Sequence, residues 1–129
     1  MKAANLAAGT AISASVAVSG ILHAYLYVNG YRDVPTIGSA FLLQGSVFCA
    51  LAVLILVGGP AWLRLAAAAG AAASLVAFGL SRTIGLFGFI ETGWQPAPYA
   101  QISVAAEVLT VALVVATVVR RRSSVRHET

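Results

Sequence analysis

Residues 37–57 read IGSAFLLQGSVFCALAVLILV and contain no charged side chain. An α-helix rises about 1.5 Å per residue, so about 20 apolar residues cross the roughly 30 Å hydrocarbon core of a bilayer. Three further apolar stretches of similar length accompany it, at residues 6–28, 62–80 and 99–119. The sequence therefore predicts an all-α integral membrane protein, a four-helix bundle whose helices run alternately up and down.

The composition of the 129-residue chain agrees with this class of protein. Hydrophobic residues make up 60% of the chain and charged residues only 9%, and the mean hydropathy is +0.90. A soluble protein of this size and composition would expose large apolar surfaces to water. Because four crossings leave only short loops and tails, we expect a single membrane domain over residues 1–129.

Glycine and proline mark the connections between the predicted helices. Residues 29–35 (NGYRDVP) end the first stretch, and Gly58-Gly59-Pro60 forms a very short link that predicts an antiparallel hairpin of the second and third stretches. Residues 66–73 are all alanine or glycine, which predicts close contact between helices. The connection 81–98 is rich in Gly, Phe and Trp, and we expect it to form an interfacial turn or a short re-entrant segment.

Basic residues are distributed unevenly between the two predicted membrane surfaces. One surface would carry Lys2, Arg64, Arg120, Arg121, Arg122 and Arg126, and the other Arg32 and Arg82. The positive-inside rule then predicts a multi-pass protein of the bacterial cytoplasmic (inner) membrane with both termini in the cytoplasm. We expect the basic tail, residues 120–129, to contact anionic lipids through Arg120, Arg121 and Arg122.

Two alternative interpretations of the chain ends are less favoured. A cleaved signal peptide would explain Lys2 followed by an apolar stretch, but this stretch continues to Val28, which is long for a signal sequence. A nucleic-acid partner would explain the pI near 9.9, but the positive charge lies directly after an apolar stretch without interleaved aromatic residues. We therefore expect no nucleic-acid partner.

Glu107 is the only charged residue far from a predicted membrane edge, and a carboxylate at such depth requires a partner. Counting at about 1.5 Å per residue places His23 about 8 Å, Gln44 about 10 Å and Glu107 about 12 Å below the outer surface. Arg82 ends the third stretch at the same surface. We expect these residues to form an outward-facing polar pocket, with Glu107 as proton acceptor or cation partner and Arg82 as its counter-charge or as an anion clamp. His23 and Gln44 would form a hydrogen-bonding wall.

Other chemistry finds little support in the sequence. Cys49 has no Cys-x-x-Cys partner, His127 lies on the tail, and no cluster has zinc-ligand spacing. We therefore expect no cofactor, no metal and no catalytic residue. Acid–base catalysis by one acid, one imidazole and one guanidinium is a minor alternative. The main alternative to the pocket is that Glu107 is protonated, or paired with Arg82 or His23, only to hold helices together.

A short motif carries a resemblance to known proteins. The chain resembles small four-helix integral membrane proteins of actinobacteria and related bacteria, which share a Ser-Arg-Thr-x-Gly loop motif and to which no activity is assigned. The residues that carry the likeness are Ser81-Arg82-Thr83-Ile84-Gly85-Leu86, Gly88, Glu91, Trp94-Gln95-Pro96, Glu107 and His23. The resemblance implies that His23, Arg82, Gly85, Trp94 and Glu107 belong together. Such proteins commonly have a Leu-Pro turn where this chain has Leu86-Phe87-Gly88.

Two functions follow as expectations. The first is binding, or proton-coupled transport, of a small molecule in the pocket of His23, Gln44, Arg82 and Glu107, with Trp94 beside it. The second is an accessory or assembly subunit of a larger membrane complex, which the small size and the alanine-rich third stretch favour. A monomer or homo-oligomer favours the first function, and a larger membrane complex with a stoichiometric foreign partner favours the second.

Overall fold

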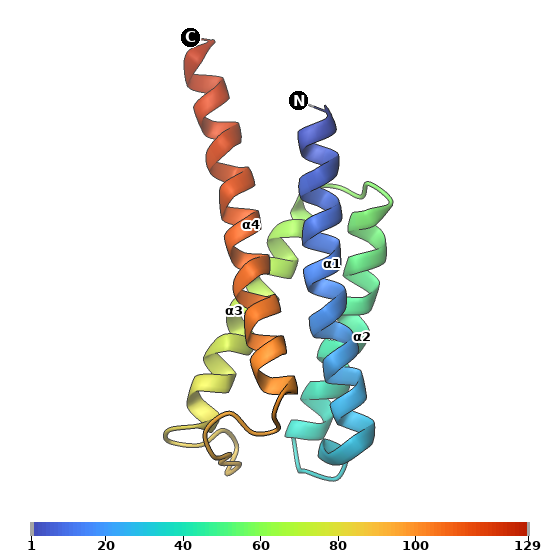
Figure 1. The fold of residues 1–129 in the computed structure, drawn as a ribbon, viewed down its shortest axis with the longest axis vertical. Helices are drawn as coiled ribbons and strands as arrows, with labels where there is room; N and C mark the ends of the chain where they lie inside the picture. The colour runs from blue at the N-terminus through green and yellow to red at the C-terminus, as the bar shows by residue number, and fades with distance from the viewer. Residues whose placement is uncertain (1, 129) are drawn as a thin grey trace.

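A computed structural model of the chain describes residues 2–128. Over these residues the fold has no strand and has four long helices: α1 (Lys2–Leu26), α2 (Ile37–Leu56), α3 (Trp62–Ser81) and α4 (Tyr99–His127). Each is long and apolar enough to cross a membrane, which confirms the all-α class predicted for an integral membrane protein. Both termini lie at one end of the bundle, here called the terminal end, and the helices alternate in direction (Figure 1).

The opposite end, here called the loop end, holds two connections of unequal length. After α1 the chain kinks in the segment η1 (Tyr27–Tyr31), in which Asn29 and Gly30 leave helical geometry. The connection 82–98 consists of turns with one isolated bridge between Leu86 and Phe89 and contains no helix. Figure 1 shows it beneath the ends of α3 and α4.

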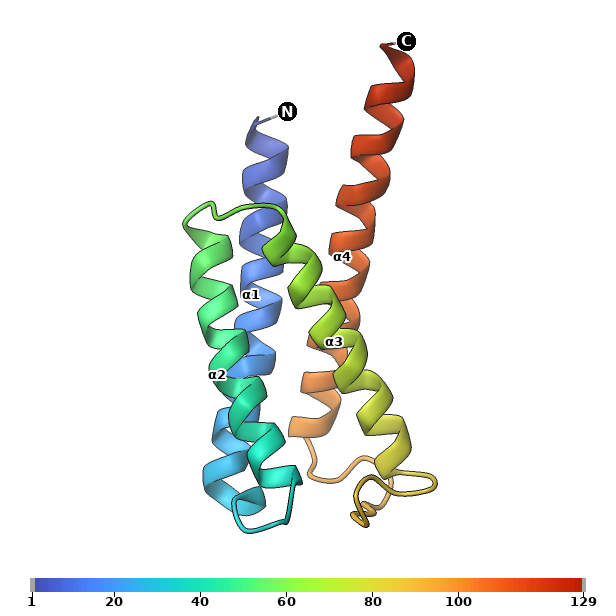
Figure 2. The same cartoon turned by 180° about the vertical axis from the view of Figure 1, so that it is seen from behind.

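The helices do not contact one another equally. α1 packs against both α2 and α4, whereas α3 packs chiefly against α4. α2 and α3 run antiparallel, as their short link predicts, but they diverge toward the loop end (Figure 2). They approach closely at Gly70, where a Cβ atom would lie 2.7 Å from the ring of Phe48. The divergence beyond this contact leaves room for a cavity in the loop-end half of the bundle.

An apolar core fills the bundle on the terminal side of this cavity. The alanine-rich segment of α3 contributes Ala67 and Ala71, whose side chains are fully buried, as the small residues there predict. The other buried members of the core are Ile12, Val16, Phe48, Leu51, Ala52, Ile55, Leu63 and Val114. Apolar side chains from all four helices therefore close the terminal half of the bundle.

Small and polar residues bring α1 close to its neighbours. A Cβ atom on Gly20 would lie 2.9 Å from the Cβ of Phe48 and 3.0 Å from the backbone nitrogen of Cys49. Ser13 donates a hydrogen bond to the carbonyl of Ala52 on α2 (2.6 Å), and the hydroxyls of Ser15 and Thr110 lie 2.7 Å apart between α1 and α4. Such contacts are typical of helix association in membranes, where hydrophobic burial contributes little.

Gly20 gives a direct test of this close contact. Gly20→Ala forces the added methyl group against Phe48 and the backbone of α2, so the two helices have to separate. We expect a loss of stability of about 1–3 kcal/mol, as for overpacked cores, measured as a lower Tm in detergent. Gly79→Ala is the matched control, because nothing lies within 4 Å of a Cβ atom there. An unchanged Tm for Gly20→Ala would show that α1 and α2 are not in contact at this point.

Candidate functional site

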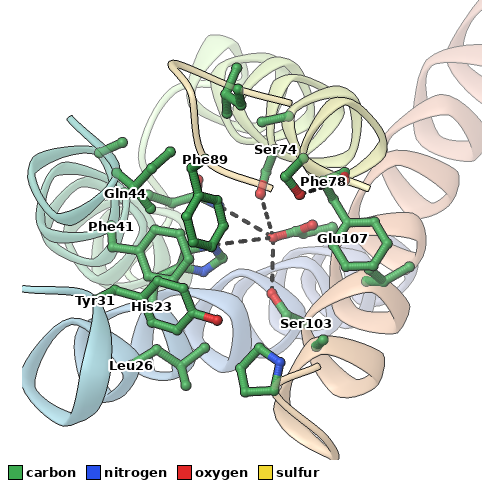
Figure 3. A pocket seen from close by; sticks show the side chains of 18 of the residues that line it. His23, Leu26, Tyr31, Phe41, Gln44, Ser74, Phe78, Phe89, Ser103 and Glu107 are labelled. Carbon is green, nitrogen blue, oxygen red and sulfur yellow. Dashed lines mark hydrogen bonds and ion pairs between the residues drawn. The ribbon is translucent and has the colours of Figure 1, made fainter. Parts of the chain in front are cut away.

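A cavity of about 120 Å³ lies between the four helices in the loop-end half of the bundle. All four helices, η1 and the connection 82–98 contribute to its walls. It adjoins Glu107 at its base, where α1, α2, α3 and α4 come together (Figure 3). The divergence of α2 from α3 leaves room for this space (Figure 2).

The carboxylate of Glu107 is the centre of a hydrogen-bond cluster, although its side chain is only 2% exposed. A single oxygen, Oε1, accepts hydrogen bonds from three serine hydroxyls and one side-chain amide, and each of these donors comes from a different one of the four helices. The donors are Ser19 at 2.9 Å, Ser74 at 2.8 Å, Ser103 at 3.1 Å and Gln44 at 3.3 Å. Figure 3 shows the lines from Oε1 to Ser74, Ser103, Gln44 and His23. Hydrogen bonds to a charged acceptor are the stronger kind, so this cluster stabilises a buried carboxylate.

His23 reaches the same oxygen from α1, with its Nε2 4.0 Å from Oε1 of Glu107. Its other ring nitrogen, Nδ1, lies 2.8 Å from the carbonyl oxygen of Ser19. A carbonyl oxygen can only accept, so Nδ1 carries the proton and donates. In the neutral ring, Nε2 therefore presents a lone pair to the base of the cavity. The ring of Phe41 packs edge-on against the imidazole, with centroids 4.9 Å apart, and holds its orientation.

The second carboxylate oxygen of Glu107, Oε2, is in a different situation. No described residue donates a hydrogen bond to it. Every side-chain oxygen or nitrogen that the described residues enclose completely does have a hydrogen-bond partner. Oε2 is therefore not fully enclosed, and Glu107 is one of the residues that line the cavity. The carboxylate at the base of the cavity thus has one oxygen without a donor among the described residues.

Aromatic side chains form the walls toward the loop end. Tyr31 of η1 stacks on Phe41 of α2, with centroids 4.7 Å apart, and contacts Phe89 of the connection edge-on at 5.8 Å. The hydroxyl of Tyr31 donates a 2.9 Å hydrogen bond to Oε2 of Glu91. This bond ties the connection 82–98 to η1 across the mouth of the cavity.

Arg82 lines the cavity, but its guanidinium is directed into the connection and not toward Glu107. Its Nε donates to the carbonyl of Gly93 (3.0 Å), and a terminal nitrogen donates to the carbonyl of Gln95. The guanidinium also lies over the ring of Phe78, 4.1 Å from its centroid. Burial lowers the pKa of Arg82 while the charge of Glu91 opposes this shift, and a guanidinium remains charged at any physiological pH. The expectation that Arg82 is the counter-charge of Glu107 is therefore wrong.

Trp94 lies outside the cavity. Its ring packs on the outer side of Phe78, with centroids 5.4 Å apart, and remains half-exposed at 52%. The structure thus brings His23, Gln44 and Glu107 into one cluster and places Arg82 and Trp94 in the connection that covers it. Gly85, the remaining residue of the loop motif, adopts a φ of +90° in that connection, a conformation that favours glycine.

Several contributors to the site, Ser19 and Ser103 among them, were not selected as site residues from the sequence, and three others show what signal was available. Ser74 is the only hydroxyl residue among residues 66–77, and that isolation could have drawn attention to it. Nothing in the sequence marks Phe41 as a site residue, because aromatic residues are common within apolar stretches. The sequence could not show that Tyr31 lines the cavity, because its position depends on the kink in η1.

Comparisons of the chain with protein-family models, with curated proteins and with solved structures find no match. The resemblance to four-helix actinobacterial membrane proteins therefore stays a prediction. Among residues 2–128 no group of three or more His, Cys, Asp or Glu side chains is placed to hold a metal ion. What the site offers is a buried carboxylate oxygen, an imidazole nitrogen and apolar walls.

The cluster around Glu107 predicts a specific effect for Ser74. Ser74→Ala removes one of the four donors to Oε1, and we expect it to lower the free energy of unfolding by about 1 kcal/mol, the usual size of polar contacts between membrane helices. Ser46→Ala is the control, since that exposed hydroxyl bonds only to the carbonyl of Leu42 in its own helix. Equal effects of the two substitutions on unfolding in detergent would contradict the interhelical role of Ser74.

Proposed function

We propose that the protein binds a small organic cation in the cavity above Glu107, with the carboxylate as its counter-charge. The observation that carries the proposal is that Oε2 has no donor among the described residues, although it belongs to a buried side chain that lines the cavity. A carboxylate oxygen with no donor beside it is best satisfied by a group that is both positively charged and a hydrogen-bond donor.

The polarity of the cavity base supports a cation over an anion. The donors at the base already bond to Oε1 of Glu107, and the guanidinium of Arg82 bonds to backbone carbonyls of the connection. The groups that remain are acceptors: Oε2 of Glu107 and, in the neutral ring, Nε2 of His23. An ammonium group carries up to three N–H donors and matches this arrangement.

The size and walls of the cavity limit the rest of the ligand. An apolar cavity of about 150 Å³ holds benzene, so a space of about 120 Å³ suits a molecule of a similar or smaller size. Tyr31, Phe41 and Phe89 offer apolar surface to a hydrocarbon group. A short alkylammonium ion, with its charge at Glu107 and its chain against these rings, satisfies both requirements.

The position of the cavity supports binding from the loop end. The apolar core of all four helices separates it from the terminal end. With the orientation that the basic residues predict, the loop end faces outward from a bacterial inner membrane. We infer that the ligand reaches Glu107 from outside the cell, past the Tyr31–Glu91 contact. Because a proton and an ammonium compete for the same carboxylate, proton-coupled transport is the natural extension of this binding.

The experiment uses three probes of similar size: n-butylammonium, which is positively charged, 1-butanol, which is neutral, and butyrate, which is negatively charged. We expect only n-butylammonium to bind the purified protein, measured by calorimetry or by a rise in Tm. Glu107→Gln keeps the size of the side chain and most of its hydrogen bonds but removes the charge, so binding should weaken at least tenfold. Asp33→Asn is the control, since it removes an exposed acid at the same end that does not line the cavity.

Equal binding of 1-butanol and n-butylammonium, or unchanged binding by Glu107→Gln, would contradict the proposal. Tighter binding of butyrate would point to an anion site instead. Purification in mild detergent tests the rival function: a stoichiometric foreign protein, together with no binding of any probe, would favour the accessory subunit.

A further inference from the structure

A second cluster of polar residues lies at the terminal end of the bundle, remote from the cavity. Two arginines from different helices converge there on one asparagine. Arg64 of α3 donates to Oδ1 of Asn5 (3.0 Å) and to its backbone carbonyl (3.4 Å), and Arg121 of α4 donates to the same Oδ1 (3.2 Å). These residues line a cleft of about 240 Å³ between α1, the α2–α3 link and α4.

The charge in this cleft is unbalanced. None of the carboxylates among the described residues lines it: Asp33 and Glu91 belong to the loop end, Glu107 to the inner cavity, and Glu128 follows the end of α4. Two guanidinium groups therefore share a neutral amide oxygen as their acceptor. Each guanidinium has five N–H donors, and only a minority of them bond to Asn5. The amino end of α3, where Ala61 also lines the cleft, adds partial positive charge.

A glycine shapes the cleft around one of the arginines. A Cβ atom on Gly9 of α1 would lie 2.8 Å from a terminal nitrogen of Arg64, so the guanidinium fits against the backbone of α1 only because this position has no side chain. Arg64 is thus held in the cleft on two sides, by Gly9 and by Asn5. An arginine that only extended into the lipid headgroup region would not require a glycine beside its guanidinium.

We propose that this cleft binds a phosphate group, either in the headgroup of an anionic lipid or as a free phosphate anion. Two guanidiniums that face a common point, with donors to spare, suit a phosphate with its several acceptor oxygens. The Nδ2 group of Asn5 supplies a further donor. The cleft lies at the end of apolar helices long enough to span a membrane, at the depth where lipid headgroups are met.

The tail arginines provide a matched control for non-specific attraction. Arg122 is exposed on the same helical segment as Arg121 but does not line the cleft. Arg122→Gln removes the same charge as Arg64→Gln, and only the latter removes a group from the proposed site. Gly9→Ala leaves every charge in place and pushes the guanidinium of Arg64 away from the backbone of α1, because the flexible side chain yields before the backbone does.

The experiment measures the rise in Tm of the detergent-solubilised protein with each of three probes: inorganic phosphate against chloride at equal ionic strength, phosphatidylglycerol, and phosphatidylcholine. We expect phosphatidylglycerol to stabilise the wild-type protein, with an apparent affinity at least fivefold weaker in Arg64→Gln and in Gly9→Ala. Arg122→Gln should weaken the affinity much less, because the tail position of Arg122 contributes only general attraction to anionic lipid. The Tm of each variant without probe shows whether it is folded.

The outcomes separate the sources of the phosphate. Stabilisation by phosphatidylglycerol alone assigns the cleft to a lipid headgroup, and stabilisation by inorganic phosphate as well assigns it to the phosphate group itself. The proposal is overturned if neither inorganic phosphate nor phosphatidylglycerol raises the Tm, or if phosphatidylcholine raises it as much as phosphatidylglycerol does. It is also overturned if Arg122→Gln weakens the affinity for phosphatidylglycerol as much as Arg64→Gln does. It is also overturned if folded Gly9→Ala binds as the wild-type protein does.

Discussion

A carboxylate placed between membrane helices has no water to solvate it, so its position constrains every helix around it. Glu107 meets this requirement with donors from all four helices, and all of them converge on Oε1. Each donor has to arrive at the same depth and on the correct face of its helix. The cluster therefore determines how the four helices are aligned relative to one another at this level of the bundle.

The rest of the bundle divides into two halves around this cluster. On the terminal side, Ile12, Val16 and their neighbours form an apolar core with the buried alanines of α3. On the loop side, α2 and α3 separate, and aromatic side chains and the connection 82–98 surround a cavity. The same carboxylate belongs to both halves, because its Oε1 joins the helices while the Glu107 side chain lines the cavity.

Much of this arrangement could be predicted from residue counting. Helices that cross a membrane convert sequence position into depth, which is why His23, Gln44 and Glu107 were expected at one level and are found in one cluster. Counting does not fix where a long side chain points: Arg82 has the expected height, but backbone carbonyls of the connection bind its guanidinium. The position of Tyr31 depends on the kink at Asn29 and Gly30, which has no signal in hydrophobic periodicity.

The most direct test of this account is an experimental structure of the protein with n-butylammonium bound. The account predicts the ammonium nitrogen within hydrogen-bond distance of Oε2 of Glu107, with Oε1 still bonded to Ser19, Ser74 and Ser103. The alkyl chain should then point toward Tyr31 and Phe41. A cation found elsewhere, or an Oε2 atom that faces lipid or bonds to a protein donor, would contradict the central claim that this carboxylate oxygen is available to a ligand.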